Sequence, residues 1–318
     1  MKHYTSIQDV ENLDQLVQEA IELKKAPFEH KHLGENKTLG MIFYNPSLRT
    51  RLSTQRAGFN LGMNVIVMNI GSDGWALEFE DGAVMNSDKA EHIKEAAEVI
   101  SQYCDVIAIR TFPRLKDRDE DYSEPVITAF KKYATVPIVS MESATGHPLQ
   151  ALADLITIEE NKTVEKPKVV LTWAPHPRLL PQAVSNSFVE FMKNSDKVDL
   201  VITHPKGYEL DPSKTEGVTI EYDQEKAFEG ADFIYAKNWS SYENYGKLDE
   251  NIDYSWMIDE AKMKNTNNGK FMHCLPVRRN VVVADDVMDN KGRNITIAEA
   301  NNRTYSAQIV LKKILEEI

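Results

Sequence analysis

The stretch P-S-L-R-T-R, residues 46–51, has the residue types needed to bind a phosphate group. It follows a short apolar run and precedes a helical pattern. Ser47 is a natural N-cap residue, and a helix capped there directs its first backbone N–H groups at an anion. The hydroxyls of Ser47 and Thr50 add hydrogen-bond donors, and the Arg49 guanidinium can bind two phosphate oxygens at once. Taken alone, such a stretch is more often a plainly capped helix with surface arginines.

Two more groups of donors follow apolar runs. Arg110 lies at the end of the run 105–111, and the sequence H-P-L-Q begins at His147, shortly after the run 136–142. Ligands of open α/β sheets bind at the carboxyl ends of the strands, so both groups fall where a ligand is expected. His147 can donate a hydrogen bond to a carbonyl oxygen, and Gln150 can bind an amide. Each group has an ordinary structural explanation, but the three together favour an anion site in the first half of the chain.

The elements that would position these residues are short apolar runs alternating with helical patterns, as in α/β proteins with parallel sheets. In the first half, strands are predicted at 39–45, 64–70, 105–111 and 136–142, and helices at about 48–61, 88–103 and 124–133. In the second half, strands are predicted at 168–174, 199–205, 218–223, 233–239 and 270–276. A helix from about Pro148 joins the halves, and a last helix spans about 299–318. We therefore predict two α/β domains, residues 1–147 and 148–298, each with a mainly parallel sheet flanked by helices.

The composition supports two domains and argues against several functions. A chain of 318 residues exceeds what one hydrophobic core usually fills. The net charge of −12 argues against nucleic acids and anionic membranes as partners. The two cysteines cannot form a disulfide framework, the N-terminal segment lacks the apolar stretch of a secretory signal, and no apolar run has the length of a membrane span. We therefore expect a cytoplasmic protein.

Four motifs, in order along the chain, resemble the aspartate/ornithine carbamoyltransferase family: S-L-R-T-R at 47–51, the strand-end Arg110, H-P-L-Q at 147–150 and H-C-L-P at 273–276. In that family the first domain binds carbamoyl phosphate and the second binds the amino-acid acceptor. The resemblance implies a carbamoyltransferase without a metal or organic cofactor, whose C-terminal helix packs back on the first domain. It also implies a homotrimer, with Trp75 of the long loop 71–87 reaching the neighbouring subunit's site.

The resemblance also implies which residues bind carbamoyl phosphate. They are Ser47, Leu48, Arg49, Thr50, Trp75, Arg110, His147, Pro148, Leu149, Gln150, Cys274, Leu275 and Arg303. In the reaction, the acceptor amine attacks the carbamoyl carbon, and phosphate leaves from a tetrahedral intermediate. Donors aimed at the developing oxyanion are the main requirement, and the leaving phosphate can take the amine proton. The residues predicted to act in catalysis are Arg49, Thr50, Arg110, His147 and Cys274.

Cys274 is predicted to orient the attacking amine rather than to act as a nucleophile. Its neighbour His273 would lie on the opposite face of the predicted strand 270–276, so the two cannot form a Cys–His dyad. The resemblance implies that the main-chain carbonyls of Cys274 and Leu275 hold the amine, with the Cys274 thiol as a further contact.

The predicted acceptor site departs from that of enzymes for free ornithine. Those enzymes carry an acidic residue and an S-M-G element where this chain reads F-I-Y-A-K-N-W at 233–239. Lys237 would repel the ammonium of ornithine but attract a carboxylate. Together with W-A-P-H-P-R at 173–178, this pattern resembles the acylornithine branch of the family. The acceptor-binding residues that the resemblance implies are Ala90, Glu142, His176, Arg178, Lys237 and Arg278, with Glu142 at the acceptor amine.

Ala90 bears on the acyl group of the acceptor. Acetyl-specific members carry an acidic residue near this position, whereas alanine removes a charge that would repel a succinyl carboxylate. We therefore expect N-succinylornithine ahead of N-acetylornithine, and both ahead of free ornithine, in a reaction of arginine biosynthesis. Two other classes are alternatives. A nicotinamide-dependent dehydrogenase is disfavoured because the chain has no G-x-G-x-x-G, and a non-catalytic anion-binding regulatory protein is disfavoured by the full set of donors.

Overall fold

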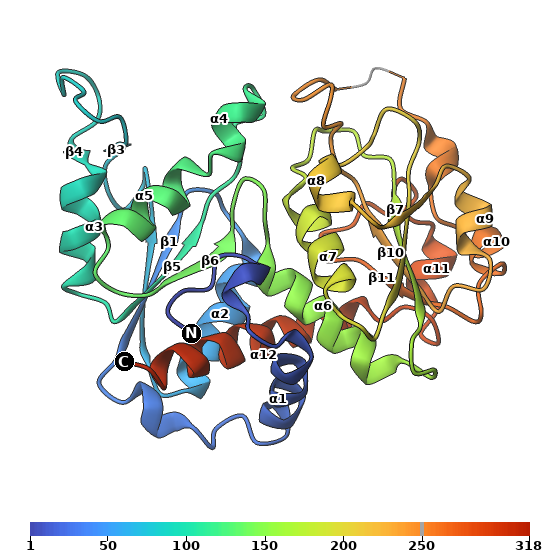
Figure 1. Ribbon diagram of the computed structural model, residues 1–318, viewed down its shortest axis with the longest axis horizontal. Helices are drawn as coiled ribbons and strands as arrows, with labels where there is room; N and C mark the ends of the chain where they lie inside the picture. The colour runs from blue at the N-terminus through green and yellow to red at the C-terminus, as the bar shows by residue number, and fades with distance from the viewer. Residues whose placement is uncertain (249–250) are drawn as a thin grey trace. The chain divides into compact units, whose positions relative to one another are not determined.

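The computed structural model describes residues 1–248 and 251–318, which form two compact units (Figure 1). Unit 1 comprises residues 1–114, 119–149 and 303–318, and unit 2 comprises residues 115–118 and 150–302. Each unit has its own parallel sheet. The predicted α/β class, with two mainly parallel sheets flanked by helices, is therefore confirmed.

The sheet of unit 1 has the strand order β2-β1-β5-β6, with all neighbours parallel. Its strands are β1 (Thr38–Phe43), β2 (Asn64–Asn69), β5 (Val106–Arg110) and β6 (Ile138–Glu142). Strands β1, β5 and β6 are buried almost throughout, as expected for parallel strands covered on both faces. Phe43 pairs with Arg110, and Arg110 pairs with Glu142. The carboxyl ends of these strands, where the predicted donors stand, therefore lie side by side.

The first half of the chain also contains five helices and a short pair of strands. The helices are α1 (Leu13–Lys25), α2 (Leu48–Asn60), α3 (Ile93–Ser101), α4 (Arg118–Tyr122) and α5 (Pro125–Tyr133), with 3-10 turns at Ile7–Asp9 and Lys31–Gly34. The short strands β3 (Leu77–Glu78) and β4 (Glu91–His92) pair in parallel. The predicted helix 88–103 is therefore wrong before Ile93, because the chain there first pairs with β3.

The C-terminal helix α12 (Thr296–Leu315) belongs to unit 1 from Arg303 onward (Figure 1). Within unit 1, Gln308 accepts a hydrogen bond from Asn60 of α2 at 2.8 Å, and the Ser306 hydroxyl donates to the main-chain oxygen of Leu149 at 2.6 Å. Both contacts are buried. The prediction that the C-terminal helix packs back on the first domain is confirmed.

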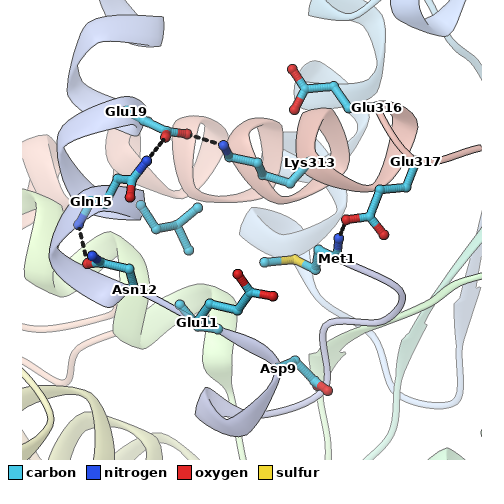
Figure 2. A pocket seen from close by; sticks show the side chains of 11 residues that line it. Met1, Asp9, Glu11, Asn12, Gln15, Glu19, Lys313, Glu316 and Glu317 are labelled. Carbon is cyan, nitrogen blue, oxygen red and sulfur yellow. Dashed lines mark hydrogen bonds and ion pairs between the residues drawn. The ribbon is translucent and has the colours of Figure 1, made fainter.

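A cavity of about 300 Å³ in unit 1 lies among the N-terminal segment, α1 and α12 (Figure 2). The Met1 amino group pairs with Glu317, and Lys313 pairs with Glu19 at 2.5 Å (Figure 2). The described residues that line this cavity include none of the residues predicted for the site. The first ion pair ties the start of the chain to the segment after α12, and the second ties α1 to α12, so this region has a structural role.

The sheet of unit 2 has the order β11-β10-β7-β8-β9, again with parallel neighbours. Its strands are β7 (Lys168–Trp173), β8 (Asp199–Thr203), β9 (Thr219–Glu221), β10 (Phe233–Lys237) and β11 (Lys270–Met272). The helices are α6 (Pro148–Asn161), α7 (Ala183–Lys193), α8 (Pro212–Thr215), α9 (Gln224–Phe228), α10 (Glu260–Met263) and α11 (Asp285–Asp289), with a 3-10 turn at Tyr254–Trp256. No helix in the described part of the chain combines the length and the apolar character needed to cross a membrane.

The predicted strand 270–276 is wrong beyond Met272. The chain turns after that residue, with Leu275 at a positive φ of 54° and a cis peptide bond between Leu275 and Pro276. The H-C-L-P motif therefore lies in a turn at the carboxyl end of β11. The alternation of side chains along a strand does not apply to His273 and Cys274, so that reason for excluding a dyad fails.

Candidate active site

The stretch P-S-L-R-T-R at 46–51, called the phosphate motif below, provides the N-cap of α2 as predicted. Ser47 has extended backbone angles, and its hydroxyl accepts a hydrogen bond from the Thr50 N–H at 3.3 Å. Leu48 is the first helical residue, and its side chain is exposed. Arg49 is half-buried. The guanidinium of Arg51 is occupied by Asn69 and by the ring of Phe43.

Arg303 lies beside the phosphate motif, although the two are far apart in the sequence. Its Nη2 donates a hydrogen bond to the Thr50 Oγ1 at 2.6 Å, and both side chains are buried. The return of α12 to unit 1 creates this contact. A cation thus stands next to the N-terminus of α2, where the helix dipole already favours an anion.

Arg110, Glu142 and His147 form a buried cluster at the carboxyl ends of β5 and β6. The Arg110 Nη2 lies 2.9 Å from the Glu142 Oε2, and the same oxygen is 3.5 Å from the His147 Nε2. The Arg110 Nη1 donates to the main-chain oxygens of Asn45 and Pro46 at 3.1 and 2.9 Å. Arg110 therefore holds the connection that leads into the phosphate motif. The predicted contact of Glu142 with the acceptor amine stays a prediction.

The loop between Glu142 and His147 is fixed by Glu124, the residue before α5. The Glu124 carboxylate accepts hydrogen bonds from the Ser143 hydroxyl at 2.6 Å and from the Thr145 N–H at 2.7 Å. It also accepts from the Ala144 N–H at 3.2 Å. The position of the His147 ring therefore depends on a carboxylate from another element of unit 1.

The remaining residues of H-P-L-Q begin α6. The main-chain oxygen of Pro148 accepts a hydrogen bond from the buried Tyr4 hydroxyl at 3.2 Å, and that of Leu149 accepts from Ser306. The boundary between the units falls here: Leu149 belongs to unit 1, and Gln150 belongs to unit 2. Its Nε2 donates to the Asp154 Oδ1 at 2.7 Å and to the Glu299 Oε1 at 3.2 Å.

The H-C-L-P turn is anchored within unit 2. The His273 N–H donates to the Glu299 Oε2 at 2.8 Å, and the His273 Nδ1 accepts from the Leu275 N–H at 2.8 Å. Burial raises the pKa of Glu299 well above its usual range, and the neighbouring Asp154 and Cys274 raise it further, against the lowering effect of the His273 N–H. Cys274 itself is buried.

Trp75 and Ala90 lie close together in unit 1. The Ala90 N–H donates to the main-chain oxygen of Ala76 at 3.3 Å, next to Trp75. The Trp75 indole is 58% exposed, and its Nε1 donates to Glu91 at 2.8 Å. Ala90 is also exposed.

A pocket of about 400 Å³ opens beside the same strand ends of unit 1. Its walls include Tyr44, Leu77, Lys89, Phe112 and Glu124. None of these residues belongs to a motif of the predicted site, although Lys89 precedes Ala90 and Phe112 follows Arg110 by two positions. That proximity in sequence is the signal that could have identified them.

Cations gather at the carboxyl ends of β7 and β10 in unit 2. Lys237 is only 9% exposed, and no described carboxylate forms an ion pair with it. The His176 Nε2 accepts a hydrogen bond from the Arg278 Nε at 3.1 Å, and its Nδ1 donates to the main-chain oxygen of Arg178 at 3.0 Å. Burial lowers the pKa of His176, and Lys237, Arg278 and Arg178 lower it further. A neutral His176 among three cations suits an anionic ligand.

The described residues contain no group of three or more His, Cys, Asp or Glu side chains arranged to hold a metal ion. Within unit 1 the structure brings together Ser47, Thr50, Arg303, Arg110, Glu142 and His147 through shared elements and contacts. Within unit 2 it brings together His176, Arg178, Lys237 and Arg278, and separately Gln150, His273 and Glu299.

Comparison with protein families identifies the chain. Residues 2–160 match the aspartate/ornithine carbamoyltransferase, carbamoyl-P binding domain, and residues 182–314 match the Asp/Orn binding domain of the same family. The chain belongs to the aspartate/ornithine carbamoyltransferase family. The predicted family is thereby confirmed, and with it the prediction that the protein is a carbamoyltransferase.

Several carbamoyltransferases match this family member over its whole length. It is 54% identical to the N-succinylornithine carbamoyltransferase of Bacteroides fragilis, with 100% of both chains covered. It is 34% identical to the N-acetylornithine carbamoyltransferase of Xanthomonas axonopodis pv. citri, with 100% of this chain and 97% of the relative covered. Among solved structures, a mutant N-acetyl-L-ornithine transcarbamylase complexed with carbamyl phosphate and N-succinyl-L-norvaline has a TM-score of 0.92 at 34% identity, with 99% of this chain and 100% of that chain covered.

Proposed function

We propose that this carbamoyltransferase moves the carbamoyl group of carbamoyl phosphate to the side-chain amine of N-succinyl-L-ornithine, giving N-succinyl-L-citrulline and phosphate in arginine biosynthesis. The observation that carries the proposal is the 54% identity, over the full length, to the N-succinylornithine carbamoyltransferase of Bacteroides fragilis. The N-acetylornithine enzymes are more distant, at 34–35% identity. The small, exposed Ala90 supports the same acyl group, because it adds no negative charge beside a succinyl carboxylate.

Carbamoyl phosphate is proposed to bind to residues 1–147 with the C-terminal helix 299–318. The N-terminus of α2 and the Thr50 hydroxyl offer donors to the phosphate, and Arg303, hydrogen-bonded to Thr50, adds positive charge. Arg110 and His147 are proposed to bind the carbamoyl oxygen. The buried Nε of Arg110 has no acceptor among the described residues, which supports a ligand contact there.

The acylornithine is proposed to bind to residues 148–298, with Ala90 and Glu142 contributing from the first domain. Lys237 and Arg278 suit the carboxylates of an acylated ornithine, whose α-nitrogen carries no charge. A buried lysine without an ion-pair partner among the described residues is electrostatically costly unless a ligand supplies the anion. That cost is the physical argument for a carboxylate at Lys237.

The chemical step is proposed to rest on positioning and on donors. The δ-amine attacks the carbamoyl carbon while Arg49, Thr50, Arg110 and His147 stabilise the negative oxygen of the tetrahedral intermediate. The carbon–oxygen bond to phosphate then breaks, and the phosphate takes the amine proton. The carbonyls of the turn at Cys274 are proposed to accept hydrogen bonds from the attacking amine, which turns its lone pair toward the carbamoyl carbon.

We also infer a cytoplasmic homotrimer in which Trp75 contributes to the neighbouring subunit's site. The exposure of the Trp75 indole is compatible with this role, because an exposed ring can be covered by a neighbouring subunit. Light scattering on the purified protein measures the assembly. A monomer that is fully active would overturn this part of the proposal.

The deciding experiment compares N-succinylornithine, N-acetylornithine and ornithine as acceptors, at one carbamoyl phosphate concentration, by measuring the citrulline derivative formed. The expected order of kcat/KM is succinyl, then acetyl, then free ornithine. A preference for N-acetylornithine would keep the reaction and overturn the acyl group. A preference for ornithine would contradict the role of Lys237, and no turnover with any acceptor would leave a non-catalytic anion-binding protein.

A further inference from the structure

A network of buried acids in unit 2 underlies two of the motifs that the proposed function uses. Asp154 and Gln150 stand on α6, and Glu299 stands on α12. Gln150, Asp154 and Glu299 are all at most 1% exposed. One nitrogen, the Gln150 Nε2, lies within 3.2 Å of an oxygen of each carboxyl group. The other oxygen of Glu299 accepts the His273 N–H that begins the H-C-L-P turn.

We propose that Asp154 and Glu299 are positioning residues that act as one carboxyl pair, fixing the Gln150 amide and the 273–276 turn for carbamoyl transfer. This inference rests on the proposed function, because the turn is its proposed contact with the attacking amine and Gln150 is among the residues predicted to bind carbamoyl phosphate. It goes further in naming the groups that hold those contacts. It also predicts a specificity that the pair confers.

The pair must share a proton near neutral pH. Two carboxylates that are fully buried and meet at one nitrogen cannot both keep a negative charge. The titratable groups that interact with the pair include Tyr235 of β10, with His273 and Cys274 after β11. Burial and the neighbouring acids also raise the pKa of Tyr235, so its hydroxyl stays neutral. One carboxyl group is therefore protonated and hydrogen-bonds to its partner.

The pair determines which way the Gln150 amide faces. Its NH2 group points at the two carboxyl groups, and a flipped amide would place its oxygen against theirs. The Gln150 Oε1 must therefore point away from the pair, as a hydrogen-bond acceptor. A carbamoyl group carries an NH2 that needs such an acceptor, whereas an acetyl group carries a methyl that cannot donate. The pair thereby selects carbamoyl phosphate over acetyl phosphate.

The turn is held by the same pair. Glu299 fixes the His273 N–H, and the His273 ring accepts the Leu275 N–H. The carbonyl groups of Cys274 and Leu275 are thereby held in one orientation. A single pair of acids thus holds both Gln150, which is proposed to bind the carbamoyl NH2, and the 273–276 turn, which is proposed to bind the attacking amine.

The first test compares Asp154→Ala with Asp154→Asn. Asparagine keeps an acceptor for Gln150 and can donate to an ionised Glu299, so Asp154→Asn should stay close to wild type. Alanine removes the nearer acceptor, so the ratio of the acetyl phosphate inhibition constant to the carbamoyl phosphate KM should fall about tenfold. Glu160→Ala is the matched control, because Glu160 also joins α6 to α12, through Asn302 at 2.8 Å, without contacting Gln150 or His273.

Each outcome of this comparison is decisive. An unchanged ratio in Asp154→Ala would overturn the specificity role. An Asp154→Asn variant as impaired as Asp154→Ala would overturn the shared proton. An equal loss of the ratio in Glu160→Ala would overturn the specificity role, because any contact between α6 and α12 would then have the same effect. Wild-type protein that carbamoylates no acceptor would instead contradict the proposed function.

A second measurement tests the pair without any turnover. A group whose pKa is raised on folding takes up a proton as the chain folds, so its contribution to stability is present at low pH and is lost as the pH rises toward the raised pKa. The melting temperature of wild type should therefore fall relative to that of Glu299→Gln as the pH rises above the usual pKa of glutamate. A difference between the two proteins that is constant with pH would refute the shared proton, whatever the activity.

Discussion

Replacing Glu142 by glutamine is expected to destabilise unit 1 by about 3–5 kcal/mol. The Glu142 Oε2 lies 2.9 Å from the Arg110 Nη2, and the side chains of both residues are only 8% exposed. An arginine keeps its charge in proteins, so the variant would leave a buried cation. The main-chain oxygens of Asn45 and Pro46 still accept hydrogen bonds from Arg110, but they carry no full charge to balance it.

Substitution of the other partner of the ion pair, Arg110→Met, should change stability with pH in a different way. It leaves a buried carboxyl group at Glu142, and a carboxyl group without its cation can become neutral by taking up a proton. In that variant the pKa of Glu142 would be raised by burial, so the variant regains stability as the pH falls and loses it as the pH rises. The cost of Glu142→Gln should not recover in this way. Arg110→Met also loses the contact of the guanidinium with the Phe112 ring, at 4.3 Å, at every pH.

The assay is thermal and denaturant unfolding of both variants at neutral and at mildly acidic pH. A loss of about 3–5 kcal/mol in a unit of this size corresponds to a fall of about 6–20 °C in Tm. The control is Glu120→Gln, because Glu120 and Arg114 pair at 2.9 Å in unit 1 with 49% and 71% of their side chains exposed. Its cost should stay below about 1 kcal/mol. The reasoning is refuted if Glu142→Gln costs no more than this control, or if Arg110→Met shows no recovery at acidic pH.

Three further substitutions probe the proposed sites. Ala90→Glu should lower kcat/KM for N-succinylornithine by about tenfold or more relative to that for N-acetylornithine. The introduced carboxylate and the succinyl carboxylate would repel each other by more than about 1 kcal/mol at a few ångströms, and competition between the two acceptors measures the ratio. Lys237→Gln should raise the KM of both acylornithines by about tenfold or more, because both lose the same charged hydrogen bond, and equal KM values in variant and wild type would contradict it. Glu124→Ala should lower kcat while N-succinylornithine KM changes little, because Ser143 and the loop before His147 lose their acceptor; steady-state kinetics decides between this and no effect.

The central strands of both sheets were predictable from the sequence, because parallel strands covered on both faces read as short apolar runs. The predictions at 105–111 and 136–142 agree with β5 and β6 to within a few residues. The short pair β3 and β4 was not predictable in this way. Two-residue strands have no period, and their pairing depends on a contact between Leu77 and Glu91. The helix α1 was not among the predicted helices, although its apolar residues recur at helical spacing.

The separate motifs of the site were also predictable, because each one follows an apolar run. Their supports were not. Asp154 and Glu299 look in the sequence like ordinary acids on the helices α6 and α12. Their meeting at Gln150 follows from the packing of these helices in unit 2, which no local pattern encodes. The same holds for Glu124, which supports a loop 20 residues away in the sequence.

Carboxylates support several of the groups proposed to bind an anionic substrate, and this arrangement needs an electrostatic explanation. A negative charge near carbamoyl phosphate would weaken its binding, yet carboxyl oxygens are strong acceptors that can fix an arginine, an amide or a loop. The buried carboxyl groups that support these contacts are compensated. Glu142 is balanced by Arg110 at 2.9 Å, and Asp154 and Glu299 share a proton. Compensation lets these acids hold the donors rigidly without repelling the substrate, which is why removing a compensating charge should harm the protein more than removing an exposed one.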